Sequence, residues 1–189
     1  LPGQNCPDST LYIVGLPIGN LGDITLRALW ILALADVVAA EDTRETRKLL
    51  DKFGISVKLL SVREHNERHG AEQIIELLQE GKKVALVTDA GTPCVSDPGA
   101  RAVKAVREAG FRVIPVPGAS AVVTALSGAG LDGSGFAFVG FVPPQSKARR
   151  NALAYWLARP EPFVLYEAPH RVVDLLEDLA AAMEPERRV

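Results

Sequence analysis

Short apolar runs alternate with stretches of helical periodicity along the first two thirds of the chain. The clearest run is Val84–Val87, which is typical of a strand buried on both faces. A loop of small, polar and proline residues follows it, and from Ala100 apolar residues recur at helical spacing. The same alternation predicts strands at 11–14, 36–40, 57–60, 84–87 and 111–116, and helices at about 25–35, 43–52, 71–80, from 100, and ending near 128.

This order of elements predicts an α/β fold with a parallel sheet and right-handed crossovers. Residues 128–135 include four glycines and indicate a linker. Beyond the linker, the pattern predicts a strand from Phe136, a helix at 145–158, a strand at 163–167 and a helix at 171–183. We therefore expect three parts: a mobile tail (1–10), an N-terminal α/β domain (11–130) and a partial, truncated C-terminal α/β domain (131–189).

Composition excludes several broad classes of protein. The 189 residues are 48% hydrophobic and 23% charged, as in globular proteins. The formal net charge of -2 excludes a surface that is basic overall, as many nucleic-acid-binding proteins have, but a local basic face is compatible with it. No apolar run is long enough to span a membrane, and no secretory signal is visible. The two cysteines favour a reducing cytoplasm, and the three unevenly spaced histidines give no metal signature.

Three glycine-containing loops follow predicted strands. The loop at 15–23 has neither the Walker nor the Rossmann spacing, so phosphate cradling is not indicated. The loop at 88–99 lies where open α/β sheets bind ligands, and Gly91 would let its backbone approach one closely. The alternative is a plain strand-to-helix connection with a helix cap at Ser96 or Asp97. The third loop begins at Pro117.

Several separated motifs resemble the bacterial ribosomal RNA small-subunit methyltransferase I family, within the tetrapyrrole-methylase-like superfamily. They occur in the family's order and cover the chain from residue 11 nearly to its end: 15–20, 40–44, 65–67, 88–93 with 96–99, 117–118, and 166–171. The chain departs from the family pattern at Leu16, where Thr is usual, at Ala119, where Pro is usual, and at Ala168, where Ser is usual. Side-chain hydroxyl contacts at these three positions are therefore not expected.

The resemblance implies a tetrapyrrole-methylase-like fold of two α/β domains, with S-adenosylmethionine (SAM) folded in the cleft between them. It also implies methylation of the 2′-hydroxyl of a cytidine in the decoding region of small-subunit (16S) ribosomal RNA, by a cytoplasmic homodimer acting on the RNA or on the assembled small subunit. No metal and no membrane are expected. The cofactor-binding residues it implies are Pro17, Ile18, Asp89, Ala90, Gly91, Thr92, Val95, Ser120, Ala121 and Tyr166.

Some of these residues are also compatible with a purely structural role. Ile18 and Val95 are also compatible with ordinary core packing, and Ser120 with a helix cap. Methyl transfer from a sulfonium is an in-line displacement that depends mainly on alignment. A ribose hydroxyl is a poor acid, however, so a carboxylate or imidazole would help to remove its proton.

Candidate proton acceptors and RNA contacts lie near predicted strand ends and helix starts. Glu41, Asp42 and His65 are the candidate catalytic residues; the alternatives are a charged helix start for the two acids and an exposed loop position for the histidine. Arg44, Arg47, Lys48, Lys147, Arg149 and Arg150 are the candidate RNA-binding residues, and a solvated helix face is the alternative.

Two rival functions remain open. The same fold also methylates small tetrapyrroles such as precorrins, and fold does not fix function. The runs at 41–44 and 65–66 favour the RNA enzyme. A non-catalytic SAM-binding or RNA-binding module is the second rival, because the C-terminal domain is expected to be incomplete.

Overall fold

A five-stranded parallel sheet forms the centre of the first part of the chain in a computed structural model that describes residues 3–131, 135–184 and 187. Its strands are β1 (Thr10–Val14), β2 (Val37–Ala40), β3 (Lys58–Ser61), β4 (Lys83–Val87) and β5 (Arg112–Val116), in the order β3-β2-β4-β1-β5. Every neighbouring pair is parallel, which confirms the predicted α/β class. Strand β1 lies between β4 and β5, and all five of its residues are buried.

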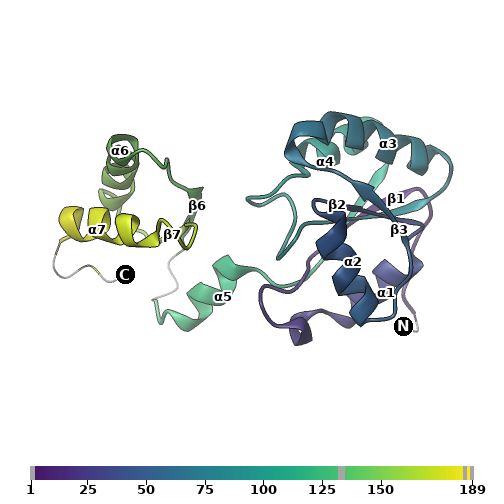
Figure 1. Ribbon diagram of the computed structural model, residues 1–189, viewed down its shortest axis with the longest axis horizontal. Coiled ribbons are helices and arrows are strands. Elements are labelled where there is room, and N and C mark those ends of the chain that lie inside the picture. Colours follow the sequence, from purple (N-terminus) through teal and green to yellow (C-terminus); the bar gives the residue numbers. More distant parts are fainter. Residues whose placement is uncertain (1–2, 132–134, 185–186, 188–189) are drawn as a thin grey trace. The chain divides into compact units, whose positions relative to one another are not determined.

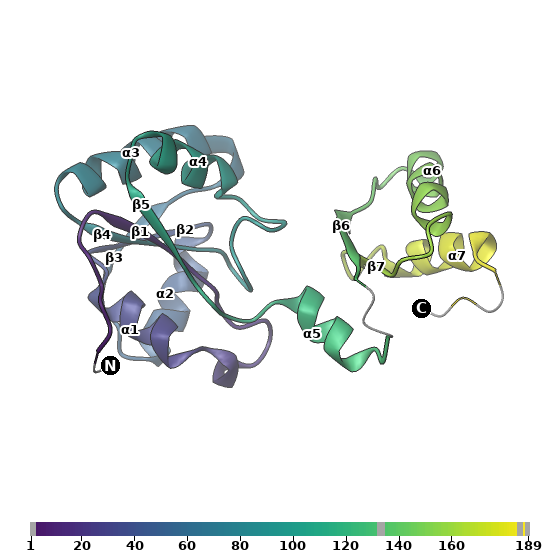
Figure 2. The same ribbon diagram turned by 180° about the vertical axis from the view of Figure 1, so that it is seen from behind.

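Two pairs of helices cover the two faces of this sheet (Figures 1 and 2). Helices α1 (Leu26–Leu34) and α2 (Thr43–Lys52) pack on one face, in a core with Tyr12, Val38 and Ala85. Helices α3 (Glu67–Gln79) and α4 (Ala100–Glu108) pack on the other, in a core with Leu11 and Leu86. Burial on both faces explains why the strands read as continuous apolar runs.

Local capping fixes where the helices begin. The Thr25 hydroxyl accepts the Ala28 N–H at 3.0 Å, and Asp42 accepts the Arg44 N–H at 2.8 Å, so these side chains are the N-caps of α1 and α2. Helix α3 begins at Glu67, four residues before the predicted start at Ala71. The first turn lacks apolar periodicity because the buried side chain there is the glutamate itself.

Residues 7–10, the end of the segment expected to be a mobile tail, interact with the sheet. The Tyr12 hydroxyl donates to the Pro7 carbonyl at 2.9 Å, and Asp8 pairs with Lys83. Thr10 is fully buried and is already the first residue of β1, one residue earlier than predicted.

A second, smaller unit spans Ala125–Val189, and the first spans Leu1–Thr124. The division falls inside α5 (Ala121–Gly128), before the predicted boundary at residue 130. In the second unit, β6 (Ala137–Phe141) and β7 (Phe163–Tyr166) form a parallel pair, while α6 (Ser146–Leu157) and α7 (Val172–Ala182) pack around Val142, Leu153, Leu175 and Leu179. No helix in the described ranges is long and apolar enough to cross a membrane.

Candidate functional site: three loops at the carboxyl edge of the sheet

Three loops meet at the edge of the sheet where β1, β4 and β5 end. Because these strands are adjacent and parallel, the loops that follow them emerge side by side. Leu16 and Gly91 join the first two loops by a pair of backbone hydrogen bonds, 2.9 Å from the Leu16 N–H to the Gly91 carbonyl and 3.1 Å in the reverse direction. The Leu16 side chain is buried in the core, so its backbone makes the connection and the hydroxyl usual in the family is not required.

The third loop packs on the first through two glycines. A Cβ built on Gly118 would lie 2.8 Å from the Gly15 Cα, and one built on Gly15 would lie 2.9 Å from the Gly118 Cα. The Thr92 hydroxyl also donates to the Ala119 carbonyl at 3.1 Å. Each loop therefore contacts both of the others, as predicted for loops that share one sheet edge.

The predicted cofactor residues of the first unit lie on these loops with different exposures. Pro17 and Gly91 are buried, Ile18, Thr92, Ser120 and Ala121 are partly buried, and Asp89, Ala90 and Val95 are exposed. Ile18 packs beside Gly91, whose φ of +72° favours glycine. Val95 is 49% exposed, which excludes core packing for that residue.

The loop at 88–99 ends at Gly99, which is the N-cap of α4 with a φ of +120°. A Cβ there would lie 2.9 Å from Leu86 and 3.1 Å from the Cys94 sulfur. The first N–H groups of α4 are bound by the carboxylate of Glu67. The alternative of a side-chain cap from Ser96 or Asp97 is therefore wrong, because a residue from another helix supplies the acceptor.

Three carboxylates gather beside the loops, where β2 and β4 end next to each other. Desolvation and the charges of Asp89 and Asp97 raise the pKa of Glu41, outweighing a backbone hydrogen bond from Asp89 and the positive charge of Arg63. Desolvation and the charge of Asp89 raise the pKa of Asp97 as well. Asp89 also accepts the Asp42 N–H at 3.1 Å. Glu41 is thus a carboxylate made more basic by its surroundings.

Asp42 and His65, the other two predicted catalytic residues, have different environments. Asp42 caps α2 and pairs with Arg44 at 2.7 Å, and these hydrogen bonds hold the pKa of its carboxyl well below the usual range. That makes Asp42 a weak base, in agreement with the helix-start interpretation. His65 is exposed in the 3₁₀ turn Glu64–Asn66 that precedes α3.

Arg44 and Arg47 of α2 line a groove of about 590 Å³ together with Thr43, Leu59 and Ser61. Arg44 is 80% exposed, although it pairs with Asp42. Arg47 donates to the Val57 carbonyl at 2.7 Å and so joins α2 to the start of β3. Lys48 pairs with Glu45 at 2.7 Å and is 68% exposed.

Arg149 does not have the solvent-facing position that RNA binding requires. It is 4% exposed, its Nε donates to Asp178 at 2.7 Å, and its Nη1 donates to the Pro144 carbonyl at 3.3 Å. This residue joins α6 to α7, so we correct its predicted role from RNA contact to structural ion pair. Lys147 and Arg150 are exposed on the same helix.

A sequence profile of the tetrapyrrole (corrin/porphyrin) methylases matches residues 10–189. The chain belongs to the tetrapyrrole methylase family. Proteins named ribosomal RNA small subunit methyltransferase I resemble it further: one from Neisseria meningitidis serogroup B is 57% identical over 95% of this chain, and one from Escherichia coli O157:H7 is 51% identical over 95%. This chain spans 62% and 63% of their lengths, respectively.

Solved structures of tetrapyrrole methylases resemble this chain in fold. The uroporphyrin-III C-methyltransferase from Thermus thermophilus has a TM-score of 0.62 and 28% identity, over 94% of this chain and 76% of that chain. A cobalt precorrin-4 methyltransferase has a TM-score of 0.67 at 19% identity, over 92% of this chain and 75% of that chain. These likenesses confirm the predicted tetrapyrrole-methylase-like fold class.

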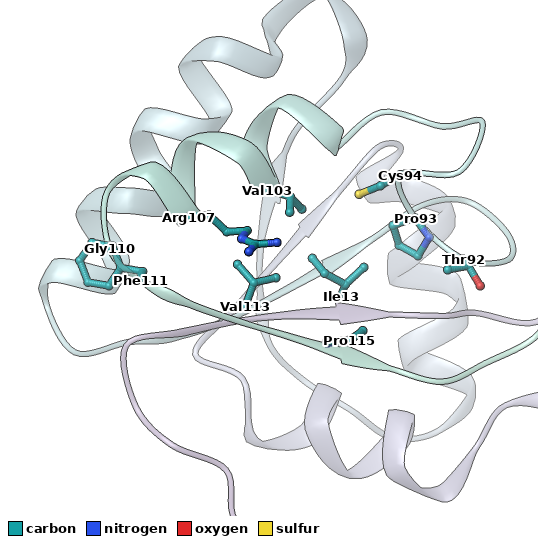
Figure 3. Close-up of a pocket in the computed structure, with 10 residues that line it drawn as sticks. All are labelled: Ile13, Thr92, Pro93, Cys94, Val103, Arg107, Gly110, Phe111, Val113 and Pro115. Atoms are coloured by element: carbon teal, nitrogen blue, oxygen red, sulfur yellow. The ribbon is translucent and has the colours of Figure 1, made fainter.

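This tetrapyrrole methylase also has a groove of about 640 Å³ beneath the 88–99 loop, between α4 and the edge strand β5 (Figure 3). Figure 3 shows Val103 and Arg107 on the helix side and Ile13 and Val113 on the strand side. Among the described lining residues, Thr92 is the one that sequence reasoning assigned to the cofactor. The groove therefore lies next to the three-loop site and is mostly separate from the predicted contacts.

In the second unit of this methylase, Tyr166 belongs to an aromatic group. Its ring centroid lies 4.9 Å from that of Phe138 and 5.7 Å from that of Phe141, both in edge-to-face geometry. Glu167, the next residue, accepts from the Ala168 N–H at 2.8 Å and from Arg171, so the segment after β7 is held without the serine usual at 168.

Sequence reasoning did not include Glu67 and Asp97 among the candidate site residues. They lie inside the motifs at 65–67 and 96–99, but neither motif indicates which backbone group or carboxylate each side chain contacts. No group of three or more His, Cys, Asp or Glu side chains suited to a metal ion occurs in the described parts of the chain.

Proposed function

We propose that this protein is a SAM-dependent methyltransferase that methylates the 2′-hydroxyl of a cytidine in the decoding region of small-subunit ribosomal RNA. The observation that carries the proposal is the similarity, at 57% and 51% identity over 95% of the chain, to proteins named ribosomal RNA small subunit methyltransferase I. The junction of the three loops supports it, since such sheet edges are where open α/β folds bind ligands.

The residues at the three-loop junction suit SAM. Hydroxyls of Thr92 and Ser120 and the carboxylate of Asp89 match the polar groups of its amino-acid and ribose parts, while Ile18 and Val95 offer apolar surface to its adenine. Pro17, Ala90, Gly91, Ala121 and, in the second unit, Tyr166 complete the proposed contacts. When bound, SAM supplies an electrophilic methyl group on a sulfonium. The chain's own residues then hold the acceptor hydroxyl in line with that group.

Glu41 is the residue that we propose as the acceptor of the ribose hydroxyl proton. Its carboxylate is partly buried, and its pKa is raised by desolvation and by the charges of Asp89 and Asp97. A base with a raised pKa accepts a proton more readily at neutral pH, as general-base catalysis requires. Arg63 donates to the Glu41 carbonyl at 3.2 Å and so helps to fix the backbone that carries this side chain.

The basic residues proposed to bind RNA phosphates are Arg44 and the partly exposed Arg47 at the α2 groove, Lys48 elsewhere on α2, and Lys147 and Arg150 on α6. We propose further that the enzyme acts in the cytoplasm as a homodimer, on ribosomal RNA or on the small subunit that contains it.

Methylation of a small tetrapyrrole is the second candidate function, favoured by the likeness to the uroporphyrin-III methyltransferase. Two measurements separate the candidates. Calorimetric titration with SAM tests cofactor binding, and transfer of a labelled methyl group is then measured with undermodified small subunits, with free 16S RNA and with a precorrin. Label on the cytidine ribose supports the proposal. Label on the precorrin alone, or SAM binding without transfer to any acceptor, overturns it.

A further inference from the structure

Glu67 is an acidic side chain buried at the start of α3, with 6% of its surface exposed. Its Oε1 accepts the N–H groups of Gly99 and Arg101, each at 2.9 Å, and that of Ala102 at 3.4 Å. These are the first N–H groups of α4, which have no partner within their own helix. A carboxylate at this helix end is stabilised by charge-assisted hydrogen bonds and by the helix dipole.

These hydrogen bonds fix one end of the 88–99 loop, and the backbone pair between Leu16 and Gly91 fixes the loop nearer its start. The segment between the two anchors, residues 92–98, carries Thr92 and Val95 of the proposed cofactor site and Asp97 of the carboxylate group. At the far end of the segment, a Cβ on Gly99 would meet Leu86 and Cys94, and the φ of +120° is one that side chains rarely adopt, so this close-packed turn has room only for glycine. The position of this segment therefore depends on where Glu67 holds Gly99.

The turn that carries Glu67 is fixed in its own right. The Asn66 side chain accepts the Arg63 N–H at 2.6 Å and donates to the Ser61 carbonyl at 3.3 Å. Arg63 in turn donates to the Glu41 carbonyl at 3.2 Å. Hydrogen bonds thus link the residue after β2 to the β3–α3 turn, and Glu67, the residue that follows this turn, continues the connection to the start of α4.

We propose that Glu67 is a positioning residue, which holds residues 92–98 where they can bind the cofactor and keeps Asp97 beside Glu41. This role rests on the proposed function. The rival role is that of a helix cap that only stabilises α4. The two differ in what a folded variant does: a pure cap leaves the loop and the cofactor affinity unchanged once the protein is folded, whereas a positioning residue changes both.

Cys94 provides a readout that does not require SAM, because its thiol is partly buried in the anchored segment. We would compare Glu67→Ala, Glu67→Gln and wild type by the rate of thiol alkylation at Cys94, followed by peptide mass spectrometry to separate it from Cys6. Glu72→Gln is the matched control, since Glu72 is an exposed glutamate on the same helix that pairs with Arg68. Folding is checked by circular dichroism at the labelling temperature.

We expect Glu67→Ala to accelerate Cys94 alkylation at least about tenfold and to raise the KM for SAM at least about tenfold, with the KM for RNA unchanged. Burial and the charges of Glu67 and Asp97 raise the pKa of the Cys94 thiol to about 11, so removal of the Glu67 charge by itself accelerates alkylation. Glu67→Gln removes the charge but keeps an acceptor oxygen, so its alkylation rate measures this electrostatic effect, and the additional acceleration in Glu67→Ala reports movement of the loop. The KM for SAM of Glu67→Gln should stay close to that of wild type. Folded Glu67→Ala with wild-type alkylation and wild-type KM for SAM overturns the positioning role. Accelerated alkylation together with no SAM binding by the wild type leaves the positioning of the loop intact and overturns the proposed function instead.

Discussion

Gly15 and Gly118 touch through their backbones, so that neither has room for a side chain. This contact joins the loop after β1 to the loop after its neighbour, the edge strand β5. We expect Gly118→Ala to destabilise the protein by roughly 1–3 kcal/mol, the usual cost of forcing an extra carbon into packed structure. Urea unfolding measures it. Gly128→Ala is the control, because a Cβ at Gly128 meets nothing within 4 Å and alanine favours the helix there.

Gly91 shows why the choice of substitution matters. A bulky residue at Gly91 is strained by its φ of +72° whether or not a cofactor binds, so loss of binding in Gly91→Val reports backbone distortion as well as filled space. Thr92→Val is a more specific test of the loop, because valine keeps the shape of the side chain and removes the hydroxyl that donates to the Ala119 carbonyl. We expect a several-fold rise in the Kd for SAM by calorimetry. An unchanged Kd would place the cofactor away from this loop.

Glu41→Gln should lower kcat about 10²–10⁴-fold, the usual contribution of a general base, with the Kd values for SAM and RNA unchanged. The base acts in its ionised form, so kcat/KM falls as pH decreases through the raised pKa of Glu41.

Asp97→Asn removes one of the charges that raise the pKa of Glu41 and should move the acidic limb of the pH profile to lower pH. Asp51→Asn, an exposed change on α2, should leave the profile in place. A pH profile that is the same in the Asp97 variant and wild type would count against Glu41 as the base.

The raised pKa of Glu41 also predicts how stability depends on pH. A carboxyl whose pKa is higher in the folded than in the unfolded state binds protons preferentially in the folded state, so its contribution to stability is complete below the unfolded pKa and is lost as pH rises through the folded pKa. Glu41→Gln should therefore raise the urea midpoint at pH 7–8 relative to wild type. The difference should disappear near pH 3, where both side chains are neutral. A difference that does not change with pH contradicts this.

RNA binding should distinguish Arg150 from its neighbour Arg149. Phosphate contacts release counterions, so Arg150→Ala should weaken RNA binding and flatten the plot of log affinity against log salt by about one unit. Lys82→Ala is the matched control. Lys82 is exposed and precedes β4, so it lies at the opposite end of the sheet from the loops. If the salt dependence of RNA affinity is the same in the Arg150 variant and the control, Arg150 lies on a solvated helix face and does not contact RNA.

Arg149→Ala should instead unfold the second unit more easily. It leaves the largely buried Asp178 carboxylate without its main partner, which costs about 3–5 kcal/mol for a buried pair. Hydrogen exchange of α6 and α7 measures the loss. Arg149→Leu combined with Asp178→Leu should recover much of the stability, since an apolar pair leaves no uncompensated charge. A double variant as unstable as Arg149→Ala would contradict this account.

Periodicity alone located the strands and helices to within a few residues, because burial on both faces makes each parallel strand an unbroken apolar run, as at Val84–Val87. The strand order was not predictable, since nothing local to β1 indicates that β4 and β5 are its neighbours. The convergence of the three loops followed from the general rule for parallel sheets.

The roles of residues that depend on partners distant in the chain could not be predicted from the sequence. Lys147, Arg149 and Arg150 form one basic cluster in sequence, and only the packing of α7 against α6 buries Arg149 at 2.7 Å from Asp178 while Arg150, 3.7 Å from the same carboxylate, stays exposed. Glu67 begins α3 without an apolar pattern to mark it, and its partners lie on another helix. Resemblance to a family supplied the cofactor and the substrate class, which local chemistry did not supply.

The position of β1 between β4 and β5 has a consequence for the order in which the sheet forms during synthesis. Synthesis delivers β1 first, yet its neighbours are β4 and β5, the last strands of its sheet to emerge. Until β4 and β5 are made, β1 has no partner for its backbone hydrogen-bonding groups, whereas β2 and β3, which are adjacent in the sheet and close in sequence, can pair with each other earlier. The pairing of β1 with β5 can therefore be completed only after Val116 has been synthesised, so we expect β1 to enter its sheet late in folding.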